Sequence, residues 1–306
     1  MVGDIVWAVV QIFCVFGLGW LARHFDYLHG EDIGRWSRVA IDFLVPCLVF
    51  SSTTKHFATE RLHELWPLPV IAFAIVLCGT GIGALVRLFL KRHSLEQRRT
   101  LHHLCAVNNA IFLPVIIVDN LWGEAAVANL FFFSLGAALG LWTIGVALLG
   151  GGHTLGQLLR HLLTPTQIAL LVALTLCLSE ATAAIPGIVQ QTTAFVGDAA
   201  IPIVLFLVGA SLYPLPVFQP RGLILLGTCL RLIGIPLVLT VILQQLPLVD
   251  DVYNMAVVNA FMPAAAISTI LTYRFGGDPQ LAAGTVVTTT LLALVTVPLG
   301  LVWALA

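Results

Sequence analysis

The sequence predicts an all-α integral membrane protein of ten transmembrane helices, arranged as two inverted repeats of five. Three observations predict it: an apolar composition, an uneven distribution of basic residues between loops, and a motif that occurs in both halves. Of the 306 residues, 59% are hydrophobic and only 9% are charged. A soluble domain needs roughly 25% charged residues. The chain is therefore predicted to lie in a bilayer.

Ten apolar runs approach the length of about 20 residues that one bilayer crossing requires. The first run has no basic residue before it, so it is predicted to be a retained span rather than a cleaved signal peptide. The predicted spans are residues 5–22, 37–53, 66–88, 101–118, 125–149, 165–185, 196–213, 221–246, 254–273 and 280–304.

Basic residues are concentrated in the loops that follow odd-numbered spans. Eleven lie there: Arg23, Arg35, Arg38, Arg87, Lys91, Arg92, Arg98, Arg99, Arg160, Arg221 and Arg274. The other loops hold only Lys55 and Arg61. Because cytoplasmic loops are enriched in Lys and Arg, we expect a multi-pass protein of the cytoplasmic (inner) membrane with both termini outside.

The two halves share a spacing of acidic residue, proline and phenylalanine. Asp42 and Pro46 precede Phe50, and Asp198 and Pro202 precede Phe206, at positions 156 residues later. Residues 1–152 would hold spans 1–5 and residues 153–306 spans 6–10. An odd number of spans per half turns one copy upside down, as in many secondary transporters.

Polar residues and prolines interrupt the fourth and ninth spans. The fourth contains Asn108, Asn109 and Pro114, and the ninth contains Asn259 and Pro263. Proline removes a helical hydrogen bond, and exposed N–H groups at half-helix N-termini attract carboxylates. We expect an anion site where the two breaks cross. The alternative is that the prolines kink two packed helices and the asparagines bond neighbouring carbonyls.

Three charged residues fall at or near membrane depth. Asp42 and Asp198 lie near the starts of their predicted spans, where we expect them to cap N–H groups freed by Pro46 and Pro202. Proton or cation coupling is the alternative role. Arg231 would either balance an anionic substrate or pair with an acid such as Asp198.

Several classes of function find no support in the sequence. The six cysteines lie in apolar runs without CxxC spacing, so neither a disulfide framework nor a metal site is predicted. His102 and His103 are adjacent and form a poor metal chelate on a helix. A net charge of -1 does not indicate a basic surface for nucleic-acid binding. We expect that the protein is not an enzyme and that it uses no cofactor.

Three motifs resemble the auxin efflux carrier family of membrane transporters, which also includes bacterial carriers of small dicarboxylates. They are the run 42–52, the run 197–202 continuing to 209–212, and Met262-Pro263-Ala264-Ala265 followed by residues 273–278. The resemblance covers nearly the whole chain. One departure is Ile116, where many members have a proline.

The resemblance implies a sodium/proton antiporter-like, elevator-type fold with broken, crossing helices 4 and 9. It implies a scaffold domain of spans 1, 2, 6 and 7, and a transport domain of spans 3–5 and 8–10. The family's crossover residues match Asn109 and Pro114 in one half, and Asn259 and Pro263 in the other.

We therefore expect a secondary active or facilitative transporter of a small organic anion, either a dicarboxylate or an auxin-like aromatic carboxylate. The partners would be that anion and the lipid bilayer. Coupling to a proton or sodium gradient and a homodimer through the scaffold domain are left open. The alternatives are a sodium-coupled organic anion symporter of the bile-acid carrier type and a membrane sensor without transport.

Overall fold

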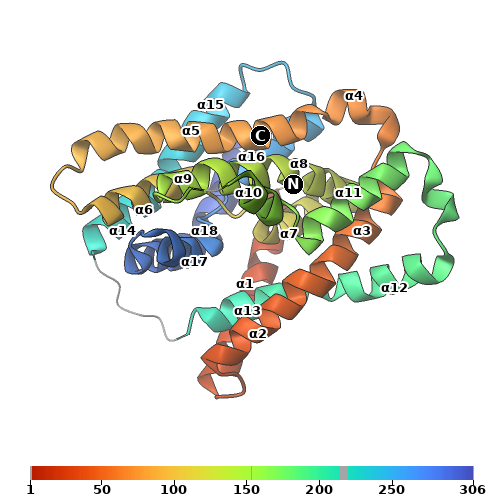
Figure 1. Ribbon diagram of the computed structural model, residues 1–306, viewed down its shortest axis with the longest axis horizontal. Helices are drawn as coiled ribbons and strands as arrows, with labels where there is room; N and C mark the ends of the chain where they lie inside the picture. The colour runs from red at the N-terminus through yellow and green to blue at the C-terminus, as the bar shows by residue number, and fades with distance from the viewer. Residues whose placement is uncertain (1, 153, 214–219, 306) are drawn as a thin grey trace.

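The computed structural model describes residues 2–152, 154–213 and 220–305, and within these ranges the chain is helical without a strand (Figure 1). The first half contains α1 (Val2–His24), α2 (Gly30–Val39), η1 (Ala40–Leu44), α3 (Val45–His56), η2 (Thr59–Arg61), α4 (Leu62–Leu65), α5 (Pro67–Phe89), α6 (Leu95–Ala106), α7 (Phe112–Trp122), α8 (Glu124–Gly140), η3 (Leu141–Gly145) and α9 (Val146–Leu148). The second contains α10 (Leu155–Leu162), α11 (Pro165–Leu178), η4 (Ala181–Ala184), α12 (Gly187–Asp198), α13 (Ala200–Ser211), α14 (Arg221–Cys229), η5 (Leu230–Gly234), α15 (Ile235–Leu243), α16 (Asp250–Ala260), α17 (Ile267–Phe275) and α18 (Pro279–Leu305).

Six helical stretches in the described chain are long and apolar enough to cross a membrane. They are Gly3–His24, Thr59–Phe89, Glu124–Leu148, Gly187–Ser211, Arg221–Leu243 and Pro279–Leu305. A seventh arises if α10 and α11, bent by 73° at their junction, form one span. The chain is thus a multi-pass membrane protein.

The four other predicted spans are short, broken or charged helices in the structure. Predicted spans 4 and 9 each divide into two helices of 9 to 12 residues, and α11 has only 14 residues. Span 2 lies within the helix Gly30–His56, whose first part is charged. Predicted span 7 starts too late at residue 196, because the helix begins at Gly187.

The helix pairs α1–α13 and α11–α3 each pack closely along their length. Between α1 and α13, a side chain added at Gly19 would collide with the backbone of Phe206, and one added at Gly209 would collide with that of Phe16. Small residues allow membrane helices to approach in this way. If α1 corresponds to α11 and α3 to α13, the two pairs are equivalent contacts in the two halves.

Asp42 and Asp198 do not cap helix starts. Asp42 lies inside η1, a π-helical turn within the continuous helix Gly30–His56, and Asp198 is the last residue of α12. Both side chains are exposed, and neither carboxylate accepts a hydrogen bond from any residue that the structure describes. Pro46 lacks an N–H group, and the N–H of Val45 bonds five residues back to Ala40. The proline is thus accommodated by a wider turn.

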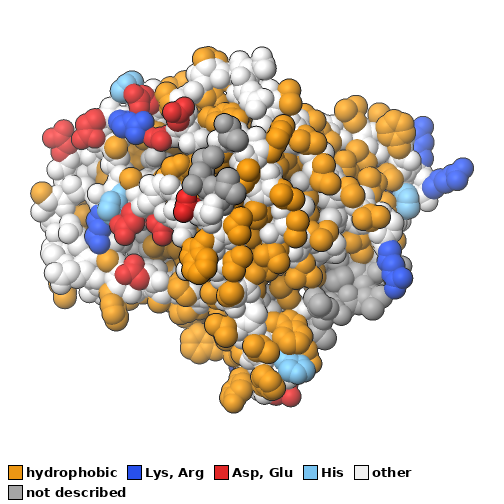
Figure 2. Space-filling view, turned by 180° about the vertical axis from the view of Figure 1, so that it is seen from behind, with side chains coloured by type: hydrophobic (Ala, Val, Ile, Leu, Met, Phe, Trp, Pro, Cys, Tyr) orange, Lys and Arg blue, Asp and Glu red, His pale blue; other side chains and the backbone are white. Residues whose placement is uncertain are grey.

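The loops predicted to lie on opposite sides of the membrane separate in space. In Figure 1 the α1–α2 connection lies at the bottom and the α5–α6 connection at the left-hand edge, whereas the α3–α4 and α11–α12 connections lie on the right-hand side and the α15–α16 connection at the top. Figure 2 shows a broad hydrophobic surface across the middle of one face, with acidic side chains gathered at one end.

Arg61, one of the two basic residues in the even-numbered loops, is paired with acids. Its Nε lies 2.8 Å from Glu64 Oε2, and its Nη1 lies 2.7 Å from Asp251 Oδ2. Arg61 donates to both carboxylates, so its positive charge is compensated by the two acids.

Candidate functional site

The two broken helices cross at their breaks, which run antiparallel to each other. The first break joins α6 to α7 at residues 107–111, and the second joins α16 to α17 at residues 261–266. Asn108 and Ala264 form an isolated antiparallel bridge, and the N–H of Asn109 donates to the carbonyl oxygen of Pro263 at 2.9 Å. The structure thus brings together the predicted residues of both halves.

The side-chain amide of Asn108 ties the two broken helices together by bonding the main chain of Asn259. The Nδ2 of Asn108 donates to the backbone oxygen of Asn259 at 2.7 Å, and the Nδ2 of Asn259 donates to Met255 within its own helix at 3.1 Å. Both side chains are buried. The Oδ1 of Asn259 is buried and has no hydrogen-bond partner in the described chain.

Asn109 is arranged differently, and its amide donor is unused. Its Oδ1 accepts the N–H of Phe112, the first residue of α7, at 3.2 Å. Its Nδ2 has no hydrogen-bond partner among the residues described, and the side chain is partly exposed. Of the three predicted asparagines, this one offers a free donor to a ligand.

The two prolines have unequal positions. Pro114 is the third residue of α7, where a missing N–H group costs little, so the helix opens before this residue rather than at it. Pro263 lies inside the second break and supplies the carbonyl that Asn109 binds. Ile116, where many family members have a proline, lies within α7.

Arg231 bonds the carbonyl oxygens at the ends of both broken helices. Its Nη1 donates to Cys105 at 3.1 Å, its Nη2 to Ala260 at 2.7 Å, and its Nε to Met262 at 3.1 Å. The side chain is 1% exposed. The predicted pairing with Asp198 is wrong, because Asp198 lies at a separate cavity described below.

The N-termini of α7 and α17 remain open at the crossing. On α7, the N–H of Leu113 has no partner among the described residues, and Pro114 has no N–H. The next N–H, that of Val115, donates to the oxygen of Ile111. On α17, Ser268 N–H bonds Ala265, whereas Ile267 N–H has no described partner. The partial negative charge of the helix C-termini is met by Arg231, whereas no carboxylate of the described residues bonds the N–H groups at the positive ends.

A cavity of about 380 Å³ lies between two groups of helices. One wall comes from α1, α3, α12 and α13, and the other from α7 and α8. Its charged and ionisable residues are Lys55, His56, Asp119, Glu124 and Asp198. His56 Nε2 lies 2.6 Å from Glu124 Oε2, so this pair connects the two walls.

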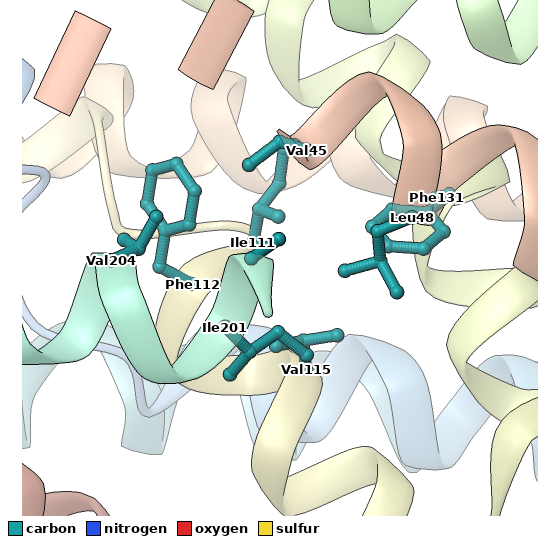
Figure 3. A pocket seen from close by; sticks show the side chains of 9 residues that line it. Val45, Leu48, Ile111, Phe112, Val115, Phe131, Ile201 and Val204 are labelled. Atoms are coloured by element: carbon teal, nitrogen blue, oxygen red, sulfur yellow. The ribbon is translucent and has the colours of Figure 1, made fainter. Parts of the chain in front are cut away.

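A small apolar space adjoins both this cavity and the first break. A second, very small space of about 10 Å³ is lined by Val45, Leu48, Ile111, Phe112, Val115, Phe131, Ala200, Ile201 and Val204 (Figure 3). Leu48 and Ile201 line both spaces, and Ile111 and Phe112 belong to the first break and the start of α7. The small apolar space therefore adjoins both the cavity and the first break, and we call these four side chains the apolar seal.

The structure adds polar contacts that the sequence pattern did not reveal. His103 is buried, with Nδ1 2.7 Å from the oxygen of Gly145 and Nε2 3.1 Å from Ser268 Oγ, so it links α6 to the π-helical turn η3 and to α17. Thr289 Oγ1 accepts the N–H of Ala264 at 3.3 Å. The residues that the structure describes contain no group of three metal-ligating side chains.

Two broken helices that cross inside an apolar helical protein are typical of secondary transporters. The chain matches the family model described as "Membrane transport protein" over residues 4–154 and 153–301. It therefore belongs to this family, the auxin efflux carrier family that its motifs resemble, which is a family of transporters and not of enzymes.

Two archaeal proteins are similar to this chain over nearly their full lengths. One, from Methanothermobacter thermautotrophicus, carries the name "Uncharacterized transporter" and is 24% identical over 295 residues, covering 95% of each chain. The other, from Methanocaldococcus jannaschii, is also named an uncharacterized transporter and is 22% identical over 303 residues, covering 97% of this chain and 96% of the relative.

Proposed function

We propose that this protein is a secondary carrier that moves a small organic anion, a dicarboxylate or an aromatic carboxylate, across the cytoplasmic membrane by alternating access. One observation carries the proposal: Arg231 occupies the helix C-termini at the crossing, while the N-termini of α7 and α17 are open. The uncompensated partial charge at the crossing is therefore positive, which favours a carboxylate.

Asn109 would supply the specific contact at this site. Its free Nδ2 is a neutral hydrogen-bond donor beside the N-terminus of α7. A carboxylate can accept several such hydrogen bonds. We place the carboxylate of the substrate against this amide and the first N–H groups of α7, with Asn108 and Asn259 holding the two breaks in position.

We further propose ten spans in two inverted halves, residues 1–152 and 153–306. The paired contacts α1–α13 and α11–α3 support this arrangement, because an inverted repeat requires equivalent packing in both halves. The separation of odd-numbered and even-numbered loops in Figure 1 also supports it. Both termini would lie outside the cytoplasm.

The cavity fits the boundary between a scaffold domain and a transport domain. Helices α1, α2–α3, α11 and α12–α13 would form the scaffold, and the helices of spans 3–5 and 8–10 would move against it. The cavity contains Lys55, His56 and Glu124, which lie toward the even-numbered loops, so substrate would enter from the outer side. The apolar seal of Leu48, Ile111, Phe112 and Ile201 would open before substrate reaches Asn109.

Proton coupling is a second candidate feature, favoured by the acids in this cavity. Asp119 and Asp198 line it from opposite walls, and a carboxylate at membrane depth is a functional candidate. A proton bound there would reduce the repulsion that an entering anion experiences. Sodium coupling of the bile-acid carrier type has less support, since Arg231 occupies the carbonyl oxygens at the crossing.

Uptake of radiolabelled carboxylates into proteoliposomes tests the proposal. The wild type should take up at least one small carboxylate, and Asn109→Ala should lower that uptake at subsaturating substrate. Asn254→Ala is the matched control, because this asparagine lies on α16 before the break. Equal uptake by all three proteins would refute the proposed site, and a wild type that transports no carboxylate would refute the proposed substrate class.

A further inference from the structure

Three main-chain carbonyl oxygens from two different helices converge on one buried side chain. Cys105 lies in the last turn of α6, Ala260 is the last residue of α16, and Met262 lies in the second break. The last carbonyls of a helix have no partner within that helix and carry partial negative charge. All three accept hydrogen bonds from Arg231.

Such carbonyl oxygens are suitable ligands for a metal cation. In carriers built on broken helices, unwound carbonyls and half-helix C-termini coordinate the coupling sodium ion or proton, and hard cations prefer oxygen ligands. Here the guanidinium group already takes these oxygens. Its fixed positive charge also disfavours a second cation nearby.

The side chain of Arg231 is held on a helix that is distorted at this residue. It belongs to η5, a π-helical turn between α14 and α15, and Pro236 follows in the first turn of α15. Arg231 forms no ion pair with any carboxylate in the described chain. The helix C-termini are therefore the groups that compensate its charge.

We infer that Arg231 is a resident cation of the crossing, which takes the place of an exchangeable coupling ion. The crossing then stays assembled without bound sodium, and transport is independent of a sodium gradient. The statement about transport rests on the proposed function, whereas the statement about assembly does not. Removal of the side chain would leave three buried acceptors and an empty space for a small cation.

Thermal unfolding of the purified full-length protein tests the inference without any substrate. The wild type should unfold at the same temperature in sodium chloride and in choline chloride. Arg231→Ala should unfold at a lower temperature, and millimolar guanidinium should recover much of the loss, because the ion refills the space. Arg221→Ala, on the first turn of the same helix, should show neither the loss nor the recovery.

Two results would overturn the inference. One is a saturable stabilisation of the wild type by sodium over choline. The other is an Arg231→Ala variant that unfolds like the wild type and does not respond to guanidinium. If Arg231→Ala does not fold, Arg231→Lys and the wild-type salt comparison decide. Lysine keeps the charge but not the forked donors, so Arg231→Lys should unfold below the wild type and, because its own charge occupies the site, should not respond to guanidinium; a variant that unfolds like the wild type would overturn the inference.

Uptake measurements separate this inference from the proposed function. Equal carboxylate uptake with external sodium and with external choline supports the inference that Arg231 replaces an exchangeable coupling ion. Uptake that requires sodium overturns it while leaving the carrier proposal intact. A wild type without carboxylate uptake but with sodium-independent unfolding would refute the carrier proposal and retain the structural role of Arg231.

Discussion

Asn109 and Pro263 are joined by a main-chain hydrogen bond of 2.9 Å, although 154 residues separate them in the chain. This bond and the bridge between Asn108 and Ala264 show that main-chain atoms hold the two breaks together. Irregular backbone at membrane depth is stable only where its polar groups find partners. The side chains of Asn108, Arg231 and Thr289 supply further partners for its main-chain groups, whereas the Nδ2 of Asn109 has no partner in the described chain and is free for a ligand.

The three asparagines should therefore respond differently to substitution. Asn108→Ala removes the 2.7 Å hydrogen bond to the oxygen of Asn259, which then keeps only the longer contact with the N–H of Met262 at 3.3 Å, and the loss of one hydrogen bond costs about 1 kcal/mol. We expect a lower unfolding temperature for Asn108→Ala. Asn109→Ala should unfold near the wild-type temperature and raise the KM of uptake instead. Comparable loss of stability in both variants would contradict this division of roles.

Close packing of α1 against α13 should depend on Gly209. A side chain at this position meets the backbone of Phe16, and overpacking costs roughly 1–3 kcal/mol. Gly209→Ala should lower the unfolding temperature in detergent. Gly17→Ala is the control, because nothing lies within 4 Å of its added carbon atom. Equal unfolding temperatures for the two variants would contradict the close approach of Gly209 to the backbone of Phe16.

A bulky side chain in the cavity should block transport. Ala194 lines the cavity, whereas the neighbouring Phe195 is 82% exposed and does not line it. Ala194→Trp should abolish uptake while the protein remains monodisperse in size-exclusion chromatography. Phe195→Trp should retain uptake. Normal uptake by Ala194→Trp would show that substrate does not pass through this cavity.

Proton coupling, if it operates through the cavity, should require Asp198 and not Asp42. Both residues occupy equivalent places in the repeated motif, but only Asp198 lines the cavity. Asp198→Asn should transport without a response to an imposed pH gradient, and Asp42→Asn should keep the wild-type response. The readout is initial uptake at several external pH values. An unchanged response in Asp198→Asn would exclude this residue as the coupling group.

Repetition in the sequence was sufficient to locate the crossing. Asn109, Asn259 and Pro263 were predicted from their paired positions, and the structure brings them together because both breaks lie in corresponding helices. The family was likewise identified correctly from short motifs. These features are local in sequence, so they can be recognised without knowledge of the packing.

Roles that depend on packing could not be predicted in the same way. Arg231 was recognised as buried, but its bonding partners are carbonyl oxygens, which every residue has and no sequence pattern distinguishes. Capping by Asp42 and Asp198 failed because the helices extend well before these residues. The cavity is lined by six helices, which approach one another only in the folded chain.

The central claim is that the open helix N-termini at the crossing bind a carboxylate. Thermal unfolding of the purified protein with a carboxylate, and with its uncharged amide analogue, tests it most directly. A ligand at 100 times its Kd stabilises the folded state by about 2.7 kcal/mol. We predict concentration-dependent stabilisation by at least one carboxylate, none by its amide, and weaker stabilisation in Asn109→Ala. Equal stabilisation by carboxylate and amide, unchanged in Asn109→Ala, would contradict the account.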